Sequence, residues 1–215
     1  MSALKKRAEP KFHRETPEVR RDSLIDATLR CLKKFGHEGV SIRRISAEAG
    51  VSIGLINHHF PNKSGLVAEA YGTLAQSLQN SLLIEASRVD AAPRERLSGF
   101  FRASFAPELI DPDLFSVWIV FWSMVRHSAQ MRAVHDRTYA DYRNILEGLL
   151  HDLVISDEAP RFKLKPAAIA LSALLDGLWV ELSLSPSTLK PADAIAFCED
   201  WVNALCGGAF MRLAR

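Results

Sequence analysis

The segment from Ser41 to Lys63 concentrates side chains that can contact the phosphates and bases of DNA. Cationic and hydroxyl groups suit phosphate oxygens, whereas an asparagine can pair with adenine and an apolar tip can touch a thymine methyl. The candidates for phosphate contact are Ser41, Arg43, Arg44, Ser52 and Lys63. The candidates that would face the bases are Ile53, Leu55, Asn57, His58 and His59. A role outside DNA recognition stays open for some of these residues. Asn57, for example, can be a solvated or locally capping side chain.

A second set of residues could bind a small cation. A quaternary ammonium has no hydrogen to donate, so aromatic faces and a nearby carboxylate bind it best. One predicted helical stripe carries Phe115, Trp118 and Trp122, with Phe121 on its flank, and another helix supplies Asp176, Trp179 and Glu181. The same stripe is equally typical of a protein core or a dimer interface, and Asp176 can simply bond a neighbouring helix end.

Other chemistry finds little support in the sequence. There is no phosphate-binding glycine loop and no nucleophile elbow, and His127 and His135 lack the carboxylate of an HExxH site. The adjacent residues His58 and His59 diverge by about 100° on a helix, which disfavours a shared metal. We therefore expect a protein that is not an enzyme, with no catalytic residue, no metal and no cofactor.

Composition and charge set the broad class. The chain has 215 residues, of which 48% are hydrophobic and 24% charged, as in ordinary soluble proteins. No apolar segment follows the basic N-terminus, and the apolar stretch 114–125 is too short to span a membrane. The three cysteines are odd in number and show no CxxC spacing, which suits a reducing compartment. We expect a cytoplasmic protein without a membrane partner.

The charge is unevenly distributed. Residues 1–70 contain thirteen Lys and Arg against eight Asp and Glu, whereas the rest of the chain is net acidic and the total is +2. A basic head on an acidic body favours a polyanion at the N-terminal end, although a chance fluctuation of a few charges explains it as well.

Apolar residues recur at helical spacing nearly throughout, which predicts an all-α fold of about nine helices. Thr16-Pro17-Glu18 starts the first helix, which Gly36 or Gly39 can end, and Ser41, Ser52 and Asn62 are good N-caps for the next three. Prolines and caps delimit five further helices near 93–106, 111–128, 130–154, 166–184 and 191–212. The segment 156–165 is expected to be an exposed loop.

The spacing at Ser41–Phe60 predicts a helix, a tight turn at Gly50-Val51-Ser52 and a second helix, as in a helix-turn-helix. We divide the chain into a basic arm at 1–15, a three-helix DNA-binding domain at 16–62 and a helical domain at 63–215. Lys5-Lys6-Arg7 of the arm can contact DNA or form a tail without a defined role. A partner-binding helical protein that does not bind DNA remains the alternative.

The motif resembles the DNA-binding signature of the TetR family of transcriptional regulators. The matching positions are Ile45, Ala47, Ala49-Gly50-Val51-Ser52, Gly54, Ile56, His58, Phe60, Lys63 and Leu66. Three further segments, at 55–60, 121–122 and 173–179, are similar to the choline-responsive BetI subgroup of that family. Most members carry an aromatic residue at the position of Asn57 and a tyrosine at or near His59, so the base-reading residues of this chain differ from the common pattern.

The resemblance implies a ligand-responsive repressor. It implies a homodimer formed by the helices near 166–184 and 191–212, a palindromic double-stranded DNA operator, and a small-molecule effector bound among the middle helices. In that docking Lys63 contacts a phosphate at the start of its helix. The effector suggested by the BetI-like segments is choline or a related quaternary ammonium, with Phe115, Trp118, Phe121, Trp122, Asp176 and Trp179 as its candidate contacts. The alternative is a regulator of another pathway or of an efflux gene that senses a different, hydrophobic ligand.

Overall fold

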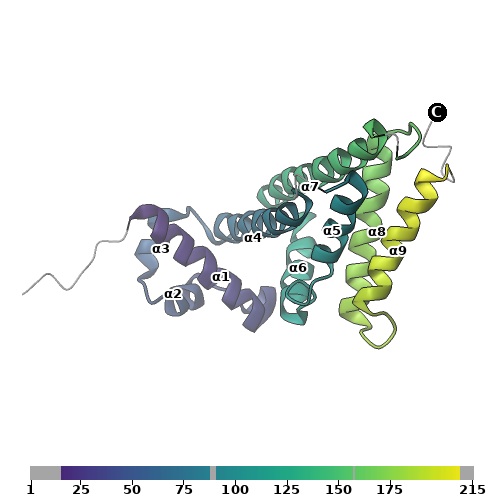
Figure 1. The fold of residues 1–215 in the computed structure, drawn as a ribbon. Helices are drawn as coiled ribbons and strands as arrows, with labels where there is room; N and C mark the ends of the chain where they lie inside the picture. The colour runs from purple at the N-terminus through teal and green to yellow at the C-terminus, as the bar shows by residue number, and fades with distance from the viewer. Residues whose placement is uncertain (1–15, 88–90, 157, 209–215) are drawn as a thin grey trace, which may run out of the picture.

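The computed structural model describes residues 16–87, 91–156 and 158–208, and in this part of the chain the fold is entirely helical (Figure 1). The predicted basic arm at 1–15 lies outside the described residues. The helices are α1 (Pro17–Gly39), α2 (Ile42–Ala49), α3 (Ile53–His59), α4 (Lys63–Ala86), α5 (Pro93–Ser104), α6 (Pro112–Val125), α7 (Ala129–Ile155), α8 (Leu164–Leu184) and α9 (Pro191–Cys206). The predicted fold class is confirmed.

Local side-chain chemistry sets the boundaries of the short N-terminal helices. The side chains of Ser41, Ser52 and Asn62 accept the backbone N–H of the residue three positions on, at 3.3, 3.3 and 2.8 Å, and so cap α2, α3 and α4. Gly50 ends α2 with φ of 66°, a left-handed conformation that glycine adopts without steric penalty. The turn between α2 and α3 therefore has the predicted geometry.

Two helix ends differ from expectation, and α1 contains a kink. α1 ends at Gly39, one of the two predicted positions, but Gly36 interrupts it with φ of 61°, and Phe35 beside this kink is 40% exposed. α8 begins at Leu164, inside the predicted loop, because a proline in the first helical turn, here Pro166, removes no helical hydrogen bond. α9 ends at Cys206, before the predicted position 212.

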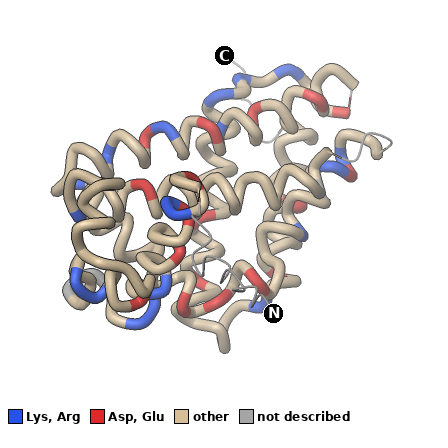
Figure 2. Tube along the Cα trace, turned by 90° about the vertical axis from the view of Figure 1, so that its left-hand side faces the viewer, with Lys and Arg blue, Asp and Glu red and all other residues tan. Residues whose placement is uncertain are grey.

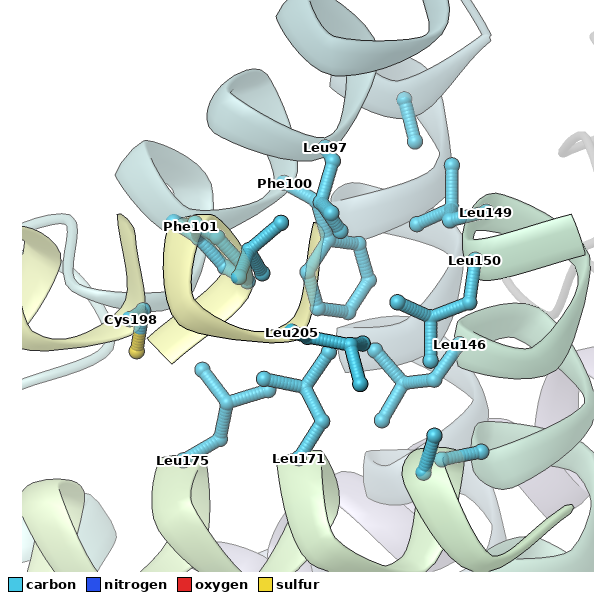
Figure 3. Packing of buried hydrophobic residues seen from close by; sticks show 14 of the residues in the cluster. Leu97, Phe100, Phe101, Leu146, Leu149, Leu150, Leu171, Leu175, Cys198 and Leu205 are labelled. Carbon is cyan, nitrogen blue, oxygen red and sulfur yellow. The ribbon is translucent and has the colours of Figure 1, made fainter. Parts of the chain in front are cut away.

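Two hydrophobic clusters form the core. One joins α1–α3 to α4, α6 and α7 through side chains such as Leu24, Ile56, Tyr71 and Phe121. The other lies among α5, α7, α8 and α9, where Leu97 and Phe100 face leucines of α7 and α8 (Figure 3). α4 contributes residues to both clusters, so the helix that follows the predicted boundary at residue 62 packs against both parts of the molecule.

α8 and α9 lie side by side at the end of the molecule opposite α1–α3 (Figure 1). Among the described helices, α8 is the one long and apolar enough to cross a membrane, whereas the sequence drew attention only to residues 114–125. Its inner face packs on α7 and α9. A third of its most apolar window is buried, and Ile169 and Leu184 remain 51% and 66% exposed.

Candidate functional site

The helix-turn-helix presents α3 on the surface at one end of the molecule, the end that faces the viewer in Figure 2. Ile56 is fully buried in the cluster that α3 shares with α1, α2 and α4, which leaves the other face of α3 outward. On that face Asn57 and His58 are exposed and Ile53 is 41% exposed, whereas Leu55 and His59 are half-buried. All five candidates for base contact thus lie on this short helix, and three of them are open to solvent.

Two of the candidate phosphate-binding cations also hold the chain between α1 and α2. Lys63 Nζ donates to the Val40 carbonyl at 3.1 Å, and the Arg44 guanidinium donates to the Gly39 carbonyl and lies 4.7 Å from the Phe35 ring. An ammonium has three donors and a guanidinium five, so each retains donors for a phosphate. Arg43 is exposed. The side-chain oxygens of Ser41 and Ser52 already accept backbone N–H groups as N-caps.

Arg21 is a structural residue of this domain that sequence reasoning missed. Its guanidinium pairs with Glu69 of α4, donates to the His59 carbonyl at 3.1 Å, and lies 4.4 Å from the Phe60 ring. One side chain of α1 thereby fixes the C-terminal end of α3 against α4. The partners stand 38 and 48 residues away, so no local pattern announces them.

A cavity of about 100 Å³ lies among α4, α5, α6, α7 and α8. This volume is well above the roughly 10–15 Å³ that one water molecule needs, so a small organic molecule fits. Aromatic and aliphatic side chains dominate its wall, with a few polar groups among them. The residues that carry the argument below are Tyr71 and Gln79 of α4, Ser104 of α5, Trp118 and Trp122 of α6, Thr138, Tyr139 and Tyr142 of α7, and Asp176 and Trp179 of α8.

Three tryptophans form one aromatic wall of the cavity. The ring centroids of Trp118, Trp122 and Trp179 are 6.2 to 6.5 Å apart, within the usual range of aromatic pairs. Trp179 Nε1 donates to the Leu109 carbonyl at 2.8 Å, which fixes the orientation of its ring. The electron-rich faces of such rings attract a cation most strongly where water is excluded.

Asp176 is the carboxylate of this cavity. Its Oδ2 accepts a hydrogen bond from the Tyr139 hydroxyl at 3.2 Å. Burial raises the pKa of Asp176 to about 6, although the Tyr139 hydrogen bond and the charge of Arg143 pull that pKa down. Near neutral pH the cavity therefore holds a mostly ionised carboxylate that lacks most of its solvent, and a ligand cation can compensate for that loss.

The other predicted ligand contacts, Phe115 and Phe121, do not line the cavity. Phe115 packs behind the wall with its ring 5.1 Å from that of Trp179, and Phe121 is fully buried 4.9 Å from the Tyr71 ring. Both share a helix with Trp118 but meet different neighbours. Sequence reasoning missed Gln79, Tyr139 and Tyr142 as wall residues, and the three-residue spacing of the two tyrosines on α7 is the signal that could have found them.

The cavity is physically connected to the helix-turn-helix. Tyr71 lines the cavity and belongs to the same buried cluster as Leu24 and Ile56 of α1 and α3, and its hydroxyl bonds to His135 Nδ1 at 2.9 Å. Burial raises the pKa of Tyr71 to about 12, so this hydroxyl stays neutral. α6, which carries two of the tryptophans, also packs directly on α1.

Two families of known proteins match this chain. Residues 24–70 match the model of the bacterial regulatory proteins of the tetR family, and residues 93–207 match the C-terminal domain of BetI-type transcriptional repressors. Among curated relatives, the regulator BetI of Burkholderia ambifaria is 30% identical over 87% of this chain and 94% of its own. BetI of Burkholderia mallei is 28% identical with the same coverage.

Solved structures share the fold. A putative transcriptional regulator from Pseudomonas aeruginosa PAO1 is 46% identical, with a TM-score of 0.86 over 93% of this chain and 96% of that one. A putative transcriptional regulator from Saccharomonospora viridis, solved in complex with choline, is 22% identical with a TM-score of 0.74 over 87% of this chain and 97% of that one. At that identity the second likeness speaks for the fold alone.

Proposed function

This chain belongs to the TetR family of bacterial regulatory proteins and has a BetI-type C-terminal domain, and from this premise we propose that it is a repressor whose operator affinity is set by a small cation in the α4–α8 cavity. The protein is a DNA-binding transcriptional regulator and not an enzyme. The observation that carries the proposal is the pairing of Asp176 with the Trp118–Trp122–Trp179 wall in one cavity.

We propose that α3 enters the major groove of a palindromic operator. Ile53, Leu55, Asn57, His58 and His59 then face the bases, because they lie on the outward part of this helix. Arg43, Arg44 and Lys63 contact phosphates around it, with Ser41 and Ser52 placing the N–H groups of two helix N-termini nearby. These contacts supply the salt-dependent part of the affinity.

We propose choline, or a related quaternary ammonium, as the effector. Its trimethylammonium group would lie on the tryptophan wall beside Asp176. The similarity to BetI repressors supports this choice, and the S. viridis regulator shows that a protein of this fold can bind choline. The cavity also borders Tyr71 and α6, so an occupant there acts on elements that pack against the helix-turn-helix.

The assembly we propose is a homodimer formed through α8 and α9. The exposed side chains of Ile169, Leu184 and Phe197 on these helices are 51%, 66% and 52% accessible, an apolar surface that a second copy would cover. Two copies related by a two-fold axis place two α3 helices toward the half-sites of a palindrome. A regulator of this kind works in the cytoplasm, where the DNA is.

Two measurements test the two halves of this function. A gel shift with the DNA upstream of the native gene should give a specific complex at moderate salt that Lys63→Ala weakens; absence of any specific complex would contradict the DNA-binding half. Isothermal titration with choline and betaine aldehyde should give binding that Trp118→Ala and Trp122→Ala weaken. No heat with either compound would leave the DNA-binding half intact and remove the choline assignment.

A further inference from the structure

Asp176 is the only acidic or basic side chain among the described residues that line the cavity. The other polar groups of the wall are neutral, and several of them bond within the protein. Gln79 Nε2 donates to the Thr138 carbonyl at 2.7 Å, and Ser104 Oγ donates to the Phe100 carbonyl at 2.8 Å. The described part of the wall therefore supplies no cation to compensate the Asp176 carboxylate.

Arg143 of α7 does not line the cavity, but it packs on a side chain that does. His135, Tyr139 and Arg143 stand four residues apart, so they lie along one stripe of this helix. The Arg143 guanidinium carbon lies 5.5 Å from the centre of the Tyr139 ring, and the hydroxyl of the same ring donates to Asp176 Oδ2 at 3.2 Å. One tyrosine thus connects the guanidinium to the carboxylate.

Arg143 has no ion-pair partner of its own among the described residues. The side chain is half-buried, and its Nε is buried without a hydrogen-bond partner in the described part of the chain. Burial raises the pKa of Asp176 to about 6, and the Tyr139 hydrogen bond and the charge of Arg143 act against that rise. The positive charge of Arg143 therefore acts on the carboxylate of the cavity.

The other ionisable groups packed around this carboxylate in the described residues are uncharged near pH 8. They are Tyr71 of α4, His135, Tyr139 and Tyr142 of α7, and Cys198 of α9. Burial raises the pKa of the three tyrosines and of the cysteine, and it lowers the pKa of the histidine. α5 and α6 contribute no ionisable side chain to the wall. Arg143 is the cation that remains to act on Asp176.

We propose that Arg143 is a built-in competitor of the effector, which compensates the charge of Asp176 in the free protein and repels a cation that binds beside it. This inference rests on the proposed function, because it takes the effector to be a cation held at Asp176. Such a cation meets a like charge across the Tyr139 ring, in a buried region where little water screens the repulsion. Arg143 then raises the effector concentration at which the regulator responds, without contacting the effector.

Isothermal titration of the full chain with choline at pH 8 tests this inference. This pH is well above the Asp176 pKa of about 6, so the carboxylate is ionised and a change in affinity reports on the charge of Arg143. Arg143→Met keeps an unbranched side chain beside the Tyr139 ring. It should bind choline about fivefold more tightly than wild type, because a nearby like charge has been removed.

Further variants assign the effect to charge. Arg143→Lys keeps the positive charge and should stay within twofold of wild type, and Arg143→Gln, which removes it, serves if Arg143→Met fails to fold. The matched control is Arg137→Met, at an exposed position of α7 outside the cavity, where affinity should not change. A pH series adds a second readout. In Arg143→Met the fall of choline affinity on acidification should begin at a higher pH, because loss of the nearby cation raises the pKa of Asp176.

The outcomes separate this inference from the proposed function. If Arg143→Met binds choline no more tightly than wild type, if its pH profile does not move, or if Arg143→Lys gains as much affinity, competition by the Arg143 charge is overturned while a cation-sensing cavity stands. If choline binds to neither wild type nor Arg143→Met, both the inference and the choline assignment are overturned, and the DNA-binding function is unaffected.

Discussion

Lys33 Nζ on α1 donates to Asp111 Oδ2 at the N-terminus of α6 across 3.0 Å. Asp111 is also the N-cap of α6, because its Oδ1 accepts the backbone N–H of Asp113 at 2.9 Å. The capping hydrogen bond from the Asp113 N–H, and then the Lys33 hydrogen bond, hold the pKa of Asp111 below its usual value. The carboxylate of Asp111 therefore joins α1, which packs on the helix-turn-helix, to α6, which carries two tryptophans of the cavity.

We predict that breaking this ion pair weakens the coupling between the two ends. Lys33→Met, and Asp111→Ser, which keeps an N-cap oxygen, should bind choline with near wild-type affinity but show a smaller change in operator affinity on saturation. Both side chains are about 40% exposed, so stability should change by less than about 1 kcal/mol. Operator affinity measured with and without choline checks this, and an undiminished response in both variants would rule out the pair as a coupling element.

Choline affinity should depend on pH through Asp176. Its pKa of about 6 in the free protein means that it binds a proton below that pH, and a bound cation favours the ionised form. Affinity should be nearly constant above pH 7 and fall toward about tenfold per unit well below pH 6. Titration calorimetry between pH 5 and 8 measures it. Asp176→Asn should bind weakly without this pH dependence, and the same slope in that variant would point to another group, such as His135.

The two kinds of DNA contact should respond differently to substitution. Arg43→Ala should weaken binding to operator and unrelated duplexes alike and reduce the slope of log K against log salt by about one. Asn57→Ala should lower operator affinity by about 1–3 kcal/mol and leave unrelated DNA almost unaffected. Fluorescence anisotropy over a salt series distinguishes them, with Lys165→Ala, at the start of α8, as control. Equal losses on both duplexes for Asn57→Ala would remove it from base recognition.

The proposed dimer makes a prediction about α8 and α9. Phe197→Asp and Ile169→Asp should shift the protein from dimer to monomer in sedimentation and lower its affinity for a palindromic duplex, because each places a charge in an apolar interface. Ile84→Asp is the matched control, since Ile84 is 71% exposed on α4. A wild-type monomer, or dimers of unchanged stability in both variants, would place the interface elsewhere.

The sequence predicted what local chemistry determines. Ser41, Ser52, Asn62 and Gly50 mark the helix ends of the DNA-binding domain because capping and left-handed backbone need only neighbouring residues. The structure brings Trp118, Trp122, Asp176 and Trp179 to one cavity, as expected from an aromatic stripe on one helix and an acid and an aromatic residue on another. That they bind a ligand stays a prediction.

What the sequence could not give depends on how distant helices meet. Gln79 and Tyr142 belong to the cavity only because α4 and α7 pack together, and Arg21 finds its partners through the same kind of tertiary contact. Phe115 lies on the predicted stripe and Phe121 on its flank, yet Phe115 packs against Trp179 of α8 and Phe121 against Tyr71 of α4. Helical periodicity says which residues face inward, but not which neighbour each of them meets.

The most direct test of the central claim is an anisotropy titration of operator duplex with wild type and Asp176→Asn, each with and without choline. We predict that saturating choline changes the operator affinity of wild type at least fivefold, the usual lower range of allosteric coupling. Asp176→Asn should bind the operator as wild type does in the absence of choline and should not respond to the same concentration. An operator affinity of wild type that choline leaves unchanged, or an equal response in Asp176→Asn, would contradict the account.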